Sequence, residues 1–134
     1  MAFVDGANNG LPSALGTAPL ALLDGKKFRD AEPFARECLE IRERTIPDDW
    51  RTFNGRSFLG GCLLGQKRYA EAEPLLLAAY EGIKQREDKI PPAGKLRPKE
   101  CLQWLVQLYE ETNRLDEAAK WKQKLAEFDQ TGNK

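Results

Sequence analysis

The chain has 134 residues, of which 41% are hydrophobic and 31% are charged, a composition typical of one folded globular domain. Its 21 basic and 21 acidic side chains cancel, so no overall field draws it to nucleic acid or to an anionic membrane surface. Histidine is absent, which removes the commonest general base and the commonest zinc ligand. We therefore expect no enzyme, no metal site and no cofactor.

The three cysteines, Cys38, Cys62 and Cys101, are widely spaced and odd in number. They fit neither a disulfide framework nor a CxxC metal site, so we expect small buried thiols and a cytoplasmic location. No apolar run reaches the roughly 20 residues that a membrane span needs. The apolar stretch at 11–23 is broken by prolines and a glycine, and no basic region precedes it as in a signal peptide.

The chain begins with a segment, residues 1–17, that we expect to be a loose leader or a cloning remnant outside the fold. A short helix is predicted at about 18–23, where Pro19 suits the first turn. The turn that follows opens the sequence GKKFRDAEPF at 25–34.

That sequence is repeated along the chain. It reappears as GQKRYAEAEPL at 65–75, and a degenerate third copy, NRLDEAA, lies at 113–119. The small residues Ala31 and Ala72 lie 41 residues apart, and Ala118 follows 46 residues later. Repetition at such periods indicates stacked supersecondary units.

Each copy continues into a predicted helix, because the apolar residues that follow it step by three or four positions. These helices are expected at about 28–39, 69–83 and 115–128. Pro33 and Pro74 fall within or just after the first turn, where the N–H groups lack intrahelical partners and a missing one costs little.

The segments before the second and third turns are also predicted to be helical, at about 52–64 and 101–109. The second of these is apolar on two sides, as expected for a helix held between neighbours. Proline-containing loops at 46–49 and 90–94 end the preceding helices. Asp49 or Thr52 can cap the helix that follows the first loop.

The order of helix, turn, helix and proline loop therefore occurs three times. It predicts an all-α solenoid of three antiparallel hairpins with six helices. The repeat domain is placed at 18–128, with repeats at about 18–46, 50–90 and 98–128 and a tail at 129–134.

The second copy carries a recognisable pattern. Arg56-x2-Leu-Gly-x2-Leu is followed by Tyr69-x2-Ala-x3-Leu-x2-Ala, which resembles the tetratricopeptide repeat, with Gly60 at its small helix-contact position. The string AEPFARECLEIRER at 31–44 is similar to the longer, kinesin-light-chain-like type of this repeat. That type is common in bacterial proteins, including tails of Ser/Thr signalling kinases.

The resemblance covers most of the chain and implies a right-handed superhelix. Its first helices would line a concave groove used for peptides or partner proteins. The third copy departs from the pattern, with Val106 where a small residue is usual and Lys122 where a bulky apolar one is. These departures suit a terminal cap, and leave open whether the third repeat contributes to a groove.

The resemblance implies a set of groove-facing positions: Asn54, Ser57, Gly61 and Leu64 in the second repeat, and Glu100, Gln103, Gln107 and Glu110 in the third. The amides of Asn54, Gln103 and Gln107 could hydrogen-bond an extended peptide, since an amide both donates and accepts. Gly61 would leave room for a ligand side chain. The alternative is an ordinary solvated face.

A basic edge is a second candidate, formed by Arg51, Arg56, Lys67 and Arg68. These side chains could steer an acidic peptide. The alternative is scattered salt bridging with neighbouring acids, which is common on helical surfaces.

The tryptophans invite the idea of an aromatic ligand site. Trp104 and Trp121 have apolar partners at helical spacing, so we expect them in the core. Trp50 is expected in a loop, where it could staple that loop to the next helix or anchor a partner.

Carboxylate pairs give no catalytic signal. Adjacent residues such as Asp48-Asp49 and Glu110-Glu111 do not face one another on a helix. Gly60-Gly61 lies in a helical pattern with no strand before it, so it does not make a phosphate loop.

The sequence therefore predicts an interaction module that binds a protein or peptide, with no nucleic-acid or membrane partner. Two alternatives remain open: a self-association module forming a homo-oligomer through the incomplete first hairpin, and a regulatory tail of a larger signalling protein such as a kinase.

Overall fold

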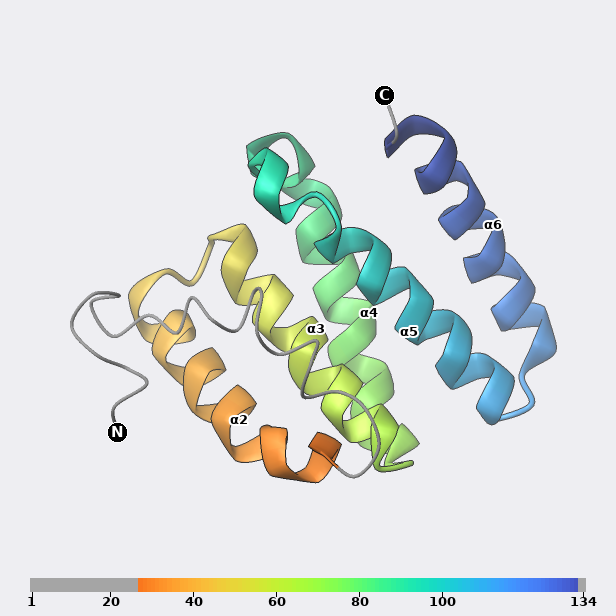
Figure 1. Ribbon diagram of the computed structural model, residues 1–134, viewed down its shortest axis with the longest axis horizontal. Coiled ribbons are helices and arrows are strands. Elements are labelled where there is room, and N and C mark those ends of the chain that lie inside the picture. The colour runs from red at the N-terminus through yellow and green to blue at the C-terminus, as the bar shows by residue number, and fades with distance from the viewer. Residues whose placement is uncertain (1–26, 133–134) are drawn as a thin grey trace.

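The structure, a computed structural model of the chain, describes residues 27–132. Within this range all regular elements are helical, and Figure 1 shows the α-helices in chain order from α2 to α6. Their bounds are Lys27–Thr45 for α2, Trp50–Gly65 for α3, Tyr69–Gln85 for α4, Arg97–Glu111 for α5 and Leu115–Gly132 for α6. Two 3-10 turns, η4 (Glu87–Lys89) and η5 (Pro92–Gly94), lie between α4 and α5.

The helices form a stack of hairpins. Each packs against the next, and α3 also contacts α5. The pairs α3–α4 and α5–α6 are two complete hairpins, while α2 precedes them and carries the copy of the repeat that corresponds to α4 and α6. The predicted all-α helical repeat fold is confirmed. The predicted helix at 18–23 and the leader at 1–17 lie outside the described residues.

The turns that close the two complete hairpins share one backbone geometry. Lys67 has a φ of 64° and Asn113 a φ of 60°, in the left-handed region that non-glycine residues seldom adopt. The next residue, Arg68 or Arg114, donates its N–H to the carbonyl five residues earlier, at 2.9 and 2.8 Å. This is a common way to end a helix. The repeat found in the sequence is therefore also a structural repeat.

Two prolines lie inside α2 and α4, and the helices tolerate them for a different reason from the one expected. Pro33 is the seventh residue of α2 and Pro74 the sixth of α4, inside each helix. At these positions an N–H would have an intrahelical acceptor, the carbonyl of Arg29 or Ala70. Both acceptor residues are exposed, so water can hydrogen-bond the carbonyls and the helices continue.

Helix α3 begins at a cap formed by Asp49, as predicted. One Asp49 carboxylate oxygen accepts from the backbone N–H of Arg51 at 2.8 Å, which satisfies one of the free donors of the first turn. The Thr52 hydroxyl instead donates to the carbonyl of Ile46 at 2.6 Å. Both contacts hold the proline loop against the start of α3.

Trp50 is the first residue of α3, which corrects its predicted place in a loop. Its ring lies against Gly94 of η5, where a Cβ atom would come within 2.6 Å of the ring. The Arg86 guanidinium donates to the carbonyl of Asp48 at 2.6 Å. Trp50 and Arg86 therefore join the two loops that separate the hairpins.

Small residues bring the helices close together. Ala31 and Ala72 are 2% and 0% exposed, as the repeat pattern requires. A Cβ atom at Gly60 would lie 2.7 Å from Cγ of Leu76, so glycine is needed where α3 crosses α4. The predicted core role of Trp121 is confirmed, because it is buried and meets the Tyr80 ring edge-on at 5.1 Å.

The third hairpin has a longer second helix than its apolar pattern predicts, and ion pairs join its two helices. Helix α6 continues to Gly132, beyond residue 128 where its apolar pattern stops. Lys99 pairs with Asp129 at 3.0 Å, and Lys122 pairs with Glu110 at 2.7 Å. Both ion pairs bridge α5 and α6, which explains why Lys122 stands at a position usually bulky and apolar.

Candidate functional site

Two of the predicted groove residues on α5, the glutamines, present their amides on an accessible face of the helix. Gln103 is exposed and Gln107 is half-buried. They lie about one turn apart and so share a face of the helix. The Gln107 amide donates to Glu111 Oε2 at 2.9 Å, and Glu111 Oε1 accepts from the Tyr69 hydroxyl at 2.8 Å. This face combines amide and carboxylate groups at the surface.

The other two groove positions of α5 are engaged in ion pairs. Glu100 pairs with Arg97 at 2.7 Å. Burial raises the pKa of Glu100 and outweighs the opposing effect of Arg97. Glu110 faces α6 through its pair with Lys122. Gln103 and Gln107 are therefore the predicted groove residues of α5 whose side chains are not held in ion pairs.

The predicted groove positions of α3 are not at the surface. Between residues 54 and 64, every residue except Arg56 is buried. Asn54 is 6% exposed, and Ser57 and Leu64 are each 1% exposed. The expectation that these side chains meet a peptide is corrected for this structure. The reason is that α3 packs against α2, α4 and α5 together.

Gly61 also has a different role from the one expected. A Cβ atom at Gly61 would lie 2.8 Å from ring atoms of Trp104 on α5. The room that we assigned to a ligand side chain is therefore occupied by Trp104. This half-buried tryptophan packs against the core, as predicted, and fills the space between α3 and α5.

The predicted basic edge is spread along α3. Arg51 pairs with Asp49 at 2.9 Å, near the start of the helix. Arg56 pairs with Glu43 at 3.3 Å, while exposed Lys67 follows the last turn. The 16 residues of α3 span roughly 24 Å, so Arg51 and Lys67 cannot form one patch. Arg51 and Arg56 instead make the scattered salt bridges considered as the alternative.

Neighbouring repeats are linked by a contact that was not predicted from the sequence. Glu32 on α2 accepts from Arg68 in the turn between α3 and α4, at 2.9 Å. The Gln66 amide donates to the same oxygen of Glu32 at 2.9 Å. Burial raises the pKa of Glu32, but hydrogen bonds from Gln66 and Arg36 and the charge of Arg68 outweigh it, so the pKa is lowered overall.

The same link occurs one repeat later. Glu73 on α4 accepts two hydrogen bonds from Arg114, at 2.8 and 3.0 Å, and one from the Tyr109 hydroxyl at 2.7 Å. The signal was present in the sequence. In both copies a glutamate follows the small residue, and an arginine follows the left-handed turn residue of the next hairpin.

Replacing Glu73 with glutamine tests this link. The bidentate Arg114 contact lowers the pKa of Glu73 below its usual 4.5. The stabilisation should therefore be present above the unfolded pKa and be lost as pH falls through the folded pKa. We expect Glu73→Gln to lower the free energy of unfolding by about 1 kcal/mol at neutral pH. Urea unfolding measured across acidic and neutral pH checks this.

The control is Glu81→Gln, at an exposed position on the same helix. It should leave stability within about 0.5 kcal/mol of wild type. A Glu73→Gln difference that persists unchanged in acid would show that the carboxylate charge is not the cause.

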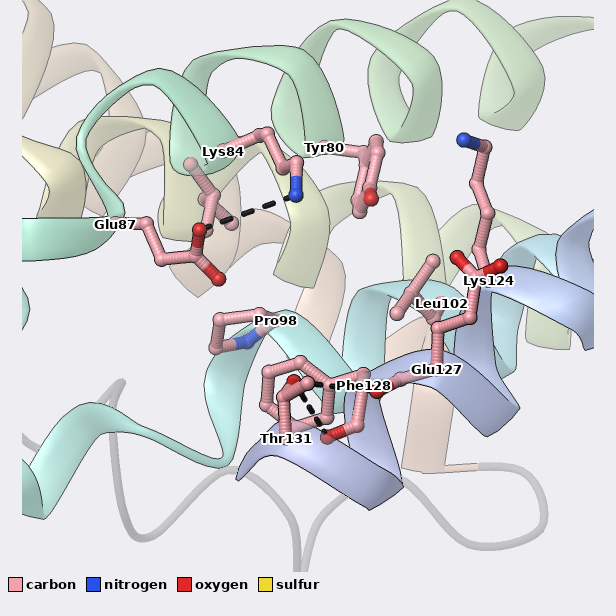
Figure 2. Close-up of a pocket in the computed structure, with 10 residues that line it drawn as sticks. Tyr80, Lys84, Glu87, Pro98, Leu102, Lys124, Glu127, Phe128 and Thr131 are labelled. Carbon is pink, nitrogen blue, oxygen red and sulfur yellow. Dashed lines mark hydrogen bonds and ion pairs between the residues drawn. The ribbon is translucent and has the colours of Figure 1, made fainter. Parts of the chain in front are cut away.

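A cavity of about 260 Å³ lies where the C-terminal halves of α4 and α6 meet the start of α5. Figure 2 shows Tyr80, Pro98, Leu102 and Phe128 around it. Charged residues of α4 and α6 stand at its rim. No sequence signal identified this site, because three separate helices supply its walls.

The three cysteines are buried, as expected. Burial raises the pKa of the Cys38, Cys62 and Cys101 thiols to about 12. They are therefore protonated at neutral pH and are poor nucleophiles. The Cys101 thiol donates to the carbonyl of Leu76 at 3.5 Å, which ties α5 to α4.

Among residues 27–132 no group of histidine, cysteine, aspartate or glutamate side chains is arranged to hold a metal ion. Over the same residues, no helix combines the length and apolar character needed to cross a membrane.

Comparison with known proteins gives one match. A family model described as tetratricopeptide repeat matches residues 20–49, a span that takes in α2 and the loop before α3. Neither curated proteins nor solved structures match the chain. Together with the stacked hairpins, the family match supports a tetratricopeptide-type repeat protein.

Proposed function

We propose that this protein is a scaffold that binds a segment of another protein on the exposed face of α5. Tetratricopeptide repeats generally mediate protein–protein interaction, and a model of this repeat matches residues 20–49. The observation that carries the proposal is that Gln103 and Gln107 are accessible on a helix, α5, that packs against α3, α4 and α6. A rigid scaffold keeps such side chains in a fixed arrangement.

The chemistry of this face suits a peptide backbone. The Gln107 amide nitrogen already donates to Glu111, which orients the side chain and leaves its carbonyl oxygen as an acceptor. Gln103 is exposed and can donate and accept. An extended segment offers N–H and C=O groups in alternation, and two amides one turn apart can each meet one of them.

The proposed surface is smaller than the groove first expected. It lies on α5 alone, because Asn54, Ser57 and Leu64 of α3 are buried and Trp104 covers Gly61. We also infer the longer, kinesin-light-chain-like type of repeat. The 41- and 46-residue spacings of its small residues support this, since they exceed the roughly 34 residues of the commonest form.

Selection of a displayed random peptide library against the whole protein tests the proposal. The double variant Gln103→Ala, Gln107→Ala should weaken the selected peptides roughly tenfold, since each lost hydrogen bond contributes about 0.5–1.5 kcal/mol. Isothermal titration calorimetry measures the change.

Gln123→Ala is the matched control. Gln123 on α6 donates to the glutamate four residues later, Glu127, just as Gln107 donates to Glu111. This variant should bind the selected peptides as wild type does. If the double variant also retains full affinity for every selected peptide, the α5 face is not the binding surface.

A further inference from the structure

One carboxylate on the accessible face of α5 has no cation to pair with. Glu100 and Glu110 are ion-paired with Arg97 and Lys122, at 2.7 Å in each case, so their charges are compensated within the protein. Glu111 is exposed, and no lysine or arginine of the described part of the chain makes an ion pair with it. The charge that this face offers to a ligand is therefore negative.

Two neutral side chains hold the Glu111 carboxylate in place. The Tyr69 hydroxyl donates to its Oε1 atom at 2.8 Å, and the Gln107 amide donates to its Oε2 atom at 2.9 Å. The hydrogen bond to Glu111 raises the pKa of Tyr69, so the hydroxyl remains a donor at neutral pH. Because neither donor is charged, the carboxylate keeps its negative charge. Each of its oxygens also keeps a lone pair for a further donor.

This carboxylate lies beside the two glutamines of the proposed binding face. Gln103, Gln107 and Glu111 follow one another at four-residue intervals, so their side chains lie along one side of α5. Gln107 and Glu111 are about 6 Å apart along the helix axis, a distance that about two residues of an extended segment span. A segment whose backbone meets Gln107 can therefore place a side chain against Glu111.

We propose that the partner segment carries a lysine or arginine that pairs with Glu111, within about two residues of the peptide group bound by Gln107. The free carboxylate attracts a cation and repels an acidic side chain. A hydrogen bond between charged groups is also stronger than one between neutral groups. The inference rests on the proposed function, because Glu111 lies on the same face as the two glutamines.

Glu111→Gln separates the charge of this side chain from its structural role. Glutamine has nearly the same shape and keeps an acceptor for the Tyr69 hydroxyl, so the contact between α4 and α5 is retained. Because position 111 is exposed, we expect the variant to unfold within about 0.5 kcal/mol of wild type. A change in ligand preference would then report on the charge.

The displayed random peptide library is selected in parallel on the wild-type protein and on Glu111→Gln. Peptides selected on the wild type should share a lysine or arginine at one position, and sequencing of the two pools shows whether they do. The pool selected on Glu111→Gln should lose this preference, because its binding face no longer carries a free negative charge.

Glu127→Gln is the matched control. Glu127 on α6 accepts from the Gln123 amide at 3.1 Å, the same arrangement as Glu111 with Gln107, but it lies on another helix. The substitution changes the net charge of the protein by the same amount. Peptides selected on this variant should keep the basic residue that the wild type selects.

One peptide selected on the wild type is then synthesised twice, with its basic residue and with glutamine in its place. Isothermal titration calorimetry should show roughly fivefold tighter binding of the basic peptide to the wild type. Glu111→Gln should bind the two peptides equally. The preference of the wild type should shrink as the salt concentration rises, because salt screens exposed charges.

The proposal is overturned if peptides selected on the wild type show no preference for basic residues, or if that preference survives in Glu111→Gln. Loss of the preference in Glu127→Gln would overturn it as well, since the cause would then be net charge. None of these results affects the proposed function, which is decided by the Gln103→Ala, Gln107→Ala variant. A library that yields no peptide at all overturns both proposals.

Discussion

Replacing Ala72 with glutamate is expected to unfold the hairpin formed by α3 and α4. Ala72 has no exposed surface, and its carbonyl lies 3.5 Å from the Cβ position of Gly60 on α3. A glutamate side chain would enter this contact without a cation to pair with it. Burying an unpaired carboxylate costs about 3–5 kcal/mol, a large part of the 5–15 kcal/mol that stabilises a typical domain.

Thermal unfolding followed by circular dichroism measures this effect. Ala70→Glu is the control, because Ala70 lies on the same helix and is exposed. It should melt within a few degrees of wild type, whereas Ala72→Glu should have lost much of its helix signal by room temperature. An Ala72→Glu protein that melts like wild type would contradict the packing of α4 on α3.

Replacing Gly61 with leucine is the second change with a large expected effect. The new Cβ atom would sit 2.8 Å from the Trp104 ring, closer than real contacts allow, and the rest of the side chain has no room. Overpacking of this kind costs about 1–3 kcal/mol, and sometimes more. Because the contact joins α3 to α5, the third hairpin should loosen from the second.

Trp104→Ala in the Gly61→Leu background is the matched test. Alone, Trp104→Ala removes packing and should cost about 3 kcal/mol. Together the two changes should cost less than the sum of their separate effects, since leucine can occupy the space that the ring leaves. Urea unfolding of the four proteins in this cycle measures the coupling. Strict additivity would show that the two residues do not compete for the same space.

The helices were predictable because their signals are local. The apolar spacing recurs in each copy, and so does the type of turn around Lys67 and Asn113. The side chain of Asp49 by itself favours the N-cap position of a helix. The small residues at Ala31 and Ala72 were recognised for the same reason. Each of these features depends on residues within a few turns of one another.

The surface was harder to predict than the fold. The resemblance to the repeat family places Gly61 in an open groove. Which side chain fills the space beside a glycine depends on another helix, however. In this protein that side chain is Trp104. The cavity beside Tyr80 depends on the distance between α4 and α6, which no local pattern sets. The link between Glu73 and Arg114 joins residues 41 positions apart. The two residue types recur in both copies of the repeat, but whether they meet depends on how one hairpin packs against the next.

The ion pairs that bridge α5 and α6 have a consequence for what can pack over the seam between these helices. An apolar surface laid along that seam would strip water from Lys122 and Glu110 and from Lys99 and Asp129, all of which are partly exposed. Taking such charges out of water can cost more than their mutual attraction returns. Anything that packs over this seam is therefore expected to leave these four groups in contact with water.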